Sequence, residues 1–172
     1  EQAIEDFNKA LELEPEYTKT YINRGIAYGK IGKYDSAIKN YNMVLELNPE
    51  YIEAYIDRGI AYAKIGKYER AIKNYNKALE LDSKFAEAYI NRGIAYGKIG
   101  KYDSAIRDFE NVLDLDPKYT EAYFNKALVC EEAGKTEEAI KSYKRFIKLS
   151  ISKGKHHIRQ AKERLKELQE EI

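Results

Sequence analysis

Two adjacent histidines and one cysteine are the side chains in this sequence best suited to metal binding or nucleophilic chemistry. His156 and His157 are the only histidines. Neighbouring residues of a helix do not share a face, so the pair is poorly placed to hold one ion, and zinc sites usually need three or four protein ligands. Cys130 is the only cysteine, at a position expected to pack between helices, whereas reactive thiols need an accessible, electropositive setting. We predict no metal site and no nucleophile.

Phosphate-binding loops and paired catalytic carboxylates are not indicated either. The recurring segment GKIGKY is rich in glycine and lysine, but it lacks the preceding strand that a phosphate loop requires. Acidic residues are numerous and follow the pattern of solvated helix surfaces. The sequence therefore predicts a protein that is not an enzyme and that uses no cofactor.

The composition narrows the partners and the setting. The 172 residues include 30 basic and 29 acidic side chains, with a net charge of +1, and 44% of them are hydrophobic. A neutral balance does not favour nucleic acid or an anionic membrane as partner, and the apolar runs are too short to span a bilayer. A single cysteine favours a cytoplasmic protein. Abundant Lys, Glu, Ile and Tyr resemble the bias reported for heat-adapted proteins.

An internal repeat determines the fold that we predict. Gly25, Gly59 and Gly93 follow one another at intervals of 34 residues, and the 18-residue segment 21–38 recurs unchanged at 89–106. Periods of this length indicate repeat arrays. We divide the chain into the second half of a truncated repeat (1–17), three repeats (18–51, 52–85 and 86–119), a degenerate repeat (120–153) and a C-terminal tail (154–172).

Each unit reads as two helices joined by a turn. In the first unit, Tyr21, Gly25 and Tyr28 share one helical face, and Gly32 offers the left-handed backbone that ends a helix. A second apolar stripe runs from Ala37 to Leu45, and Pro49 then ends that helix. Small residues such as Gly25 and Ala37 would let the two helices approach closely, with tyrosines filling the grooves between them. The arginines Arg24, Arg58 and Arg92 are expected to pair with acids or amides on the second helix.

Residues at equivalent positions of successive units form rows, and these rows resemble the pattern of the tetratricopeptide repeat family over residues 1–153. The matching positions are an aromatic row, a glycine row, a tyrosine row, an alanine row and a second aromatic row: Tyr21/Tyr55/Tyr89/Tyr123, Gly25/Gly59/Gly93, Tyr28/Tyr62/Tyr96, Ala37/Ala71/Ala105/Ala139 and Tyr41/Tyr75/Phe109/Tyr143. Tyrosine in the first row departs from the family's usual tryptophan. The resemblance implies an all-α, right-handed superhelical solenoid of antiparallel helix hairpins. In the tail, an apolar stripe from Ile158 to Ile172 predicts a capping helix that begins near His156.

The resemblance also implies which positions line the concave face and bind a protein or peptide. They are the second, fifth, sixth and ninth residues of each unit. The fifth and ninth rows are apolar: Ile22, Ile56 and Ile90, followed by Ile26, Ile60 and Ile94. The sixth row is polar: Asn23, Asp57, Asn91 and Asn125. Asparagine amides both donate and accept hydrogen bonds, which suits the backbone of an extended peptide. A similar asparagine ladder lines the superhelix of O-linked N-acetylglucosamine transferases.

A second binding mode of this family is not expected here. Co-chaperone domains hold acidic chaperone tails with a clamp of Lys, Asn and Arg at five positions of these rows. This sequence has Ile22, Ile26, Asp57, Glu87 and Asn91 at those positions, and none of them matches. Asp57 and Glu87 would repel an acidic tail.

The first segment suggests self-association. Residues 1–13 read as a second helix whose partner helix is missing, so the chain looks like part of a longer one. Part of the stripe that includes Ile4, Phe7 and Leu11 is then expected to be bare and to contact another copy, either at the same end or at the capping helix.

Several functions remain open from the sequence alone. The leading interpretation is a protein-interaction scaffold that binds an extended peptide or a partner helix. The alternatives are a structural module that stacks with copies of itself and a regulatory array fused to an enzyme elsewhere in a longer chain. An RNA-binding helical array is a fourth, which the 34-residue period and the neutral charge disfavour.

Overall fold

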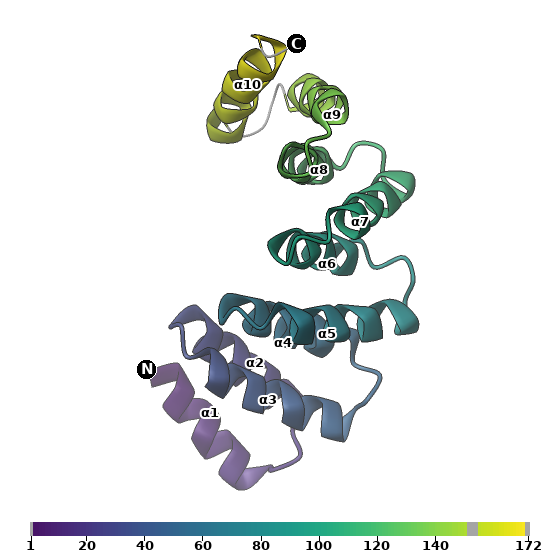
Figure 1. The fold of residues 1–172 in the computed structure, drawn as a ribbon. Helices are drawn as coiled ribbons and strands as arrows, with labels where there is room; N and C mark the ends of the chain where they lie inside the picture. Colours follow the sequence, from purple (N-terminus) through teal and green to yellow (C-terminus); the bar gives the residue numbers. More distant parts are fainter. Residues whose placement is uncertain (1, 151–154, 171–172) are drawn as a thin grey trace. The chain divides into compact units, whose positions relative to one another are not determined.

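The computed structural model describes residues 2–150 and 155–170, and every regular element in that part of the chain is an α-helix. The helices are α1 (Gln2–Leu13), α2 (Thr18–Lys30), α3 (Tyr34–Leu47), α4 (Ile52–Lys64), α5 (Tyr68–Leu81), α6 (Ala86–Lys98), α7 (Tyr102–Leu115), α8 (Thr120–Glu132), α9 (Thr136–Leu149) and α10 (Lys155–Glu170). Figure 1 shows how short turns join them into hairpins. The predicted all-α repeat fold is confirmed.

The chain divides into two compact units, residues 1–91 and residues 92–172. In unit 1, α2 packs against α1 and α3, α3 packs against α4, and α4 packs against α5 (Figure 1). In unit 2, α8 packs between α7 and α9, and α10 lies against α9 (Figure 1). Each helix therefore contacts mainly its neighbours in the chain, as expected for a repeat array.

A glycine in the left-handed conformation closes each turn within a hairpin. Gly32, Gly66, Gly100 and Gly134 have φ between 71° and 74°, a region that residues with a Cβ rarely adopt. After Gly32, the backbone N–H of Lys33 donates to the carbonyl of Tyr28 at 2.9 Å. This bond satisfies an acceptor at the end of α2, so the turn predicted from GKIGKY is confirmed.

Close contacts between glycine and aromatic rings build the interior of the hairpins. A Cβ placed on Gly59 would lie 2.4 Å from Cε1 of Tyr75, and one on Gly25 would lie 2.7 Å from Cε1 of Tyr41. Tyr75 is 1% exposed. The alanine row and the second aromatic row are buried throughout, as the sequence predicts. The tyrosines of the first helices are only half-buried in most units.

Helix α10 covers the end of unit 2. Ala161 and Leu168 are buried against Tyr143 and Phe146 of α9, with Ile158 and Leu165 packed at the edge. Ala161 follows Ala127 by 34 residues, so α10 continues the register of the first helices. Ile172, the last residue of the predicted stripe, lies outside the described residues.

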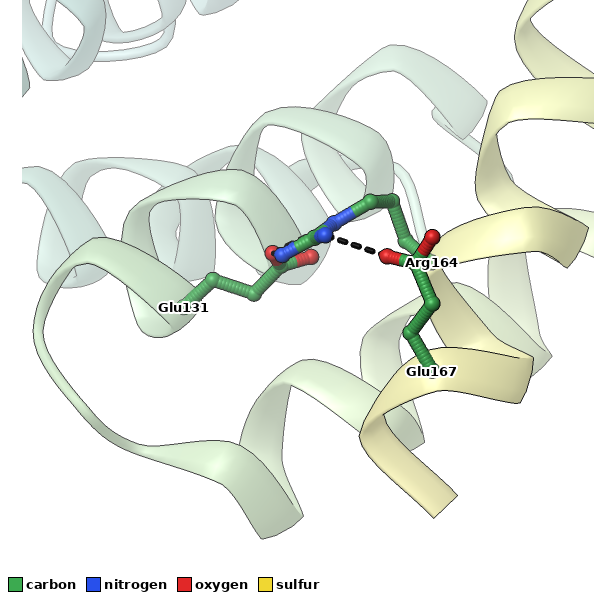
Figure 2. A network of polar contacts seen from close by, with 3 residues as sticks. All are labelled: Glu131, Arg164 and Glu167. Atoms are coloured by element: carbon green, nitrogen blue, oxygen red, sulfur yellow. Dashed lines mark hydrogen bonds and ion pairs between the residues drawn. The ribbon is translucent and has the colours of Figure 1, made fainter. Parts of the chain in front are cut away.

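An arginine on α10 ties this helix to the hairpin before it. Arg164 donates through Nε to Glu131 of α8 at 2.9 Å and through Nη2 to the same carboxylate. Its Nη1 donates to Glu167 on its own helix, and Figure 2 shows the guanidinium between the two carboxylates. Glu131 is largely buried and Arg164 is about half-exposed. The pair therefore helps to fix the orientation of α10 against α8, in addition to the apolar contacts.

Candidate binding grooves

Unit 1 contains a pocket of about 260 Å³ between α2, α3 and α4. Ile26 and Gly29 of α2 form one wall, Tyr41 of α3 lies at the base, and Asp57 and Ile60 of α4 form the other wall. The lysines Lys30 and Lys64, at the ends of α2 and α4, also line it. Ile26 is 37% exposed. The pocket therefore offers an apolar surface with one carboxylate.

Unit 2 contains the same pocket, built from positions 68 residues further along the chain. Ile94, Gly97, Phe109, Asn125 and Leu128 replace Ile26, Gly29, Tyr41, Asp57 and Ile60 in turn, and the volume is about 170 Å³. It is narrower at one wall, because Val129 stands where unit 1 has Ala61 and its Cγ2 would lie 3.1 Å from a Cβ on Gly97.

Gly29 and Gly97 line the pockets, although no binding role was predicted for them from the sequence. Position 63, one repeat after Gly29 and one repeat before Gly97, holds alanine. This alternation between glycine and alanine is the signal that could have revealed the two glycines. A second glycine in the first helix of alternate repeats removes a side chain that would project from the wall of the pocket. A Cβ on Gly29 would meet no atom within 4 Å, so packing does not require this glycine.

The fifth row of the expected concave face is mostly interior. Ile56 is 2% exposed and Ile90 is 4% exposed, and Ile22 packs against the cluster around Tyr21 and Val44. These side chains contribute to the contacts between helices. Ile56 and Ile90 have too little exposed surface to contact a partner in this arrangement.

The sixth and ninth rows are more accessible. Asn23 is exposed, and Asp57, Asn91 and Asn125 are half-buried. Ile26 and Ile94 are exposed and Ile60 is half-buried. The side-chain amide of Asn91 donates to the carbonyl of Glu87 at 3.0 Å, so one of its donors is used within its own helix. The structure thus brings Ile26, Asp57 and Ile60 into one pocket and places Asn125 in the other.

The arginine row forms bridges between helices. Arg24 donates to Asn40 of α3 at 2.8 Å and to Asn8 of α1 at 2.8 Å. Arg58 repeats both bonds, to Asn74 of α5 and to Asn42 of α3. In unit 2, Arg92 forms a bidentate pair with Asp108 of α7. The predicted pairing with amides or acids on the second helix is confirmed, and these arginines support the fold.

Asp57 is set apart by its electrostatic surroundings. Burial, followed by the nearby carboxylates of Glu87 and Glu53, raises the pKa of Asp57 to about 6. Among the described residues, no lysine or arginine forms an ion pair with it. By contrast, the buried Asp108 pairs with Arg92 and the half-exposed Glu110 with Lys126. The wall of the unit 1 pocket therefore carries an uncompensated charge at neutral pH.

Changing Asp57 to asparagine is expected to stabilise the chain at pH 7.5 by about 1 kcal/mol, after allowance for screening by solvent. The folded-state pKa of Asp57 lies above its unfolded value, so the wild-type chain loses stability as pH rises from about 4 through about 6. The gain should therefore disappear below about pH 4. Urea unfolding of both proteins at pH 4 and pH 7.5 measures it, and an equal gain at both pH values would show that charge is not the cause.

Cys130 and His157 have structural surroundings. The Cys130 thiol is fully buried in the α8–α9 cluster, and burial raises its pKa to about 11. The expectation that Cys130 packs between helices is confirmed. The ring of His157 lies 5.0 Å from that of Phe124, and the side chain of His156 lies outside the described residues. Within the described part of the chain, His, Cys, Asp and Glu form no group of three or more suited to a metal ion.

The stripe on α1 is partly covered. Ile4 and Phe7 are half-buried, whereas Leu11 is 8% exposed and belongs to the cluster with Tyr21, Val44, Leu45 and Ala54. Leu11 is therefore an interior residue of unit 1. Any contact with another copy through this helix would rest on Ile4 and Phe7.

Repeated helix hairpins with a pocket between successive first helices define a helical-repeat protein. Tetratricopeptide repeat models match residues 1–17, 18–51, 40–73, 86–119 and 109–141, and a TPR repeat model matches residues 61–100. The chain belongs to the tetratricopeptide repeat family. No curated protein matches it. No helix in the described ranges has the length and hydrophobicity to cross a bilayer.

Solved structures show the same fold. The crystal structure of MamA is 28% identical, with a TM-score of 0.80 over 86% of each chain. The second TPR domain of human RPAP3, in complex with the HSP70 peptide SGPTIEEVD, is 34% identical, with a TM-score of 0.61 over 63% of this chain and 91% of that one. The first TPR of Spaghetti (RPAP3), bound to the HSP90 peptide SRMEEVD, is 29% identical, with a TM-score of 0.66 over 68% of this chain and 93% of that one.

Proposed function

We propose that this chain is a protein-interaction scaffold that binds an extended peptide or a partner helix along the first helices of its hairpins. The observation that carries the proposal is the pocket of unit 1, where an exposed apolar residue, Ile26, faces Ile60 and Asp57 across a space of about 260 Å³. A bulky side chain of a peptide would fill this space and remove apolar surface from water.

The polar rows beside the pocket would hold the peptide backbone. Asn23 is exposed on α2, and Asp57 is half-buried on α4. Side chains of this kind can donate to or accept from main-chain groups and so fix the direction of an extended segment. Two relatives of the same fold were solved with bound peptides, which supports peptide binding as the general mode.

Selection from a random peptide library displayed on phage tests the proposal. Peptides recovered with the wild-type chain should perturb the NMR signals of Asn23, Ile26, Asp57 and Ile60. Changing Ile26 to Ser should weaken the binding of these peptides about tenfold, because it removes apolar surface from the pocket. The control is Leu47→Ser on α3, which is equally exposed at 37% and should have no effect. Failure to recover any binder, or signals confined to α3 and α5, would contradict the proposal.

Acidic chaperone tails are expected not to bind. The peptides SGPTIEEVD and SRMEEVD, bound by the RPAP3 domains, would meet Asp57, Glu53 and Glu87 in unit 1, and like charges repel. Isothermal titration calorimetry with either peptide should give no specific heat at pH 7.5. Saturable binding with a micromolar Kd would mean that these carboxylates do not face the ligand.

Self-association is a second proposal, and it rests on the exposed apolar surface at the start of the chain. Leu13 is 84% exposed and Tyr17 is 51% exposed, and Phe7 on the same helix as Leu13 is half-buried. We expect oligomers at high concentration, because pairing would cover this surface. Phe7→Glu should shift the mass measured by light scattering toward the monomer, whereas Glu12→Gln, on the same helix, should not. An unchanged mass for Phe7→Glu would exclude this contact.

A further inference from the structure

The two pockets differ in the positions at which they carry charge. In unit 1 the α4 wall carries Asp57, and Tyr41 of α3 also lines the pocket. In unit 2 the equivalent positions hold the neutral Asn125 and the ring of Phe109. The apolar and glycine positions are kept, as Ile26 and Ile94 or Gly29 and Gly97 show, whereas at the helix end Glu132 stands in unit 2 where unit 1 has Lys64. A partner side chain in the unit 1 pocket would therefore meet a carboxylate on the α4 wall, a position that is neutral in unit 2.

The charge in this pocket has no counter-ion within the described chain. The charged groups that raise the pKa of Asp57, after burial, are the carboxylates of Glu87 and Glu53. Burial and, to a smaller extent, Asp57 raise the pKa of the Tyr41 phenol above its usual range. Elsewhere in the chain, the carboxylates of Asp108 and Glu131 form ion pairs with Arg92 and Arg164. The fold supplies no equivalent cation to Asp57 among the ion pairs of the described residues.

The two lysines that line the pocket stand away from this carboxylate along the helices. Lys64 follows Asp57 by seven residues on α4, which corresponds to about 10 Å along a helix axis. Lys30 occupies the same place at the end of α2. Both lysines are exposed, so at physiological salt their fields are largely screened over this separation. The pocket is thus negative at the Asp57 wall and positive at the helix ends.

We infer that the unit 1 pocket binds a lysine or arginine side chain of the peptide partner. Its aliphatic stem lies against Ile26 and Ile60, and its charged head points to Asp57. Long basic side chains bury their methylene groups on apolar surface while the head stays at a polar site. This charge complementarity contributes more to the specificity for the partner than to the affinity. The inference rests on the proposed peptide-binding function and names the residue class that the peptide must present.

A double-mutant cycle on the full chain tests the inference. From the displayed library, the tightest basic peptide bound by the wild type is synthesised in two forms, with its lysine or arginine retained or replaced by norleucine, which keeps an apolar stem and removes the charge. For the wild type, norleucine should weaken binding about tenfold. For Asp57→Asn, the two forms should bind within about twofold of each other, because the counter-charge is gone.

Matched controls separate the pocket charge from the overall charge. Glu46→Gln removes one exposed carboxylate from α3 and should keep the tenfold preference. Asparagine occupies the equivalent positions 23, 91 and 125, so Asp57→Asn is compatible with the fold. The wild-type preference should also fall between pH 7.5 and pH 5, as protonation removes the charge of Asp57.

The outcomes distinguish the two proposals. If library peptides bind at the unit 1 groove but show no preference for a basic residue, or if Asp57→Asn retains the preference, the inference is overturned while the peptide-binding function stands. If no peptide binds at the groove, both are overturned. A tenfold preference that disappears in Asp57→Asn and persists in Glu46→Gln supports the inference.

Discussion

Replacing Arg92 with methionine is expected to lower the free energy of unfolding by about 3 kcal/mol. The Arg92 guanidinium makes two hydrogen bonds to Asp108, at 2.8 Å and 2.6 Å, and the Asp108 side chain is only 3% exposed. Methionine keeps the apolar stem and leaves a buried carboxylate without its charge partner. Breaking one side of such a pair typically costs about 3–5 kcal/mol, and the low end applies because Arg92 is itself partly exposed. Urea unfolding at pH 7 measures the loss.

The repeat supplies the control for this prediction. Arg24 and Arg58 make the corresponding contact to the neutral amides of Asn40 and Asn74. Asp108→Asn should therefore cost less than about 1 kcal/mol, since it copies the neighbouring repeats and leaves no buried charge.

The pH dependence of the Arg92→Met variant has a definite sign. Burial already raises the pKa of Asp108 despite the opposing effect of Arg92, and loss of the arginine raises that pKa further. A raised folded-state pKa means that stability is present at low pH and is lost as pH rises. The variant should regain part of its stability between pH 7 and pH 5. An equal deficit at both pH values would show that packing, and not charge, explains the loss.

Replacing Gly59 with leucine is expected to lower the free energy of unfolding by about 3 kcal/mol, the upper part of the usual range for overpacking. A Cβ at this position would already lie 2.4 Å from Cε1 and 2.9 Å from Cδ1 of Tyr75. Tyr75 is 1% exposed, so its ring cannot move aside without displacing its neighbours. Helices α4 and α5 must therefore separate to admit the new side chain, which breaks the contacts of the whole hairpin.

Gly29→Ala is the matched control, because it places a Cβ on the neighbouring first helix where no atom lies within 4 Å. Alanine favours a helix over glycine by about 1 kcal/mol, so this variant should be as stable as the wild type or more so. A melting temperature for Gly59→Leu equal to that of the wild type would show that the two helices are not in close contact at this point.

Much of the fold could be predicted from the sequence for a physical reason. The 34-residue period repeats a local code, in which Gly32 ends one helix, Pro49 ends the next and the glycine and alanine rows require close helix contacts. These features act between residues close in the chain, so one sequence suffices to read them. The same code predicted that Arg24 would pair with an acid or amide on the second helix, and that a helix in the tail would cover the last hairpin.

The tertiary structure decided which side chains face a partner. The isoleucine rows look alike in the sequence, but Ile56 is buried between hairpins and Ile26 is exposed beside a pocket. Leu11 appears in the sequence to belong to an open stripe, whereas it is covered by residues up to 43 positions further along the chain, such as Ala54. The surroundings of Asp57 likewise come from α3, α4 and α6 together. Periodicity identifies the face of one helix, but the exposure and charge of that face depend on which other helices pack against it.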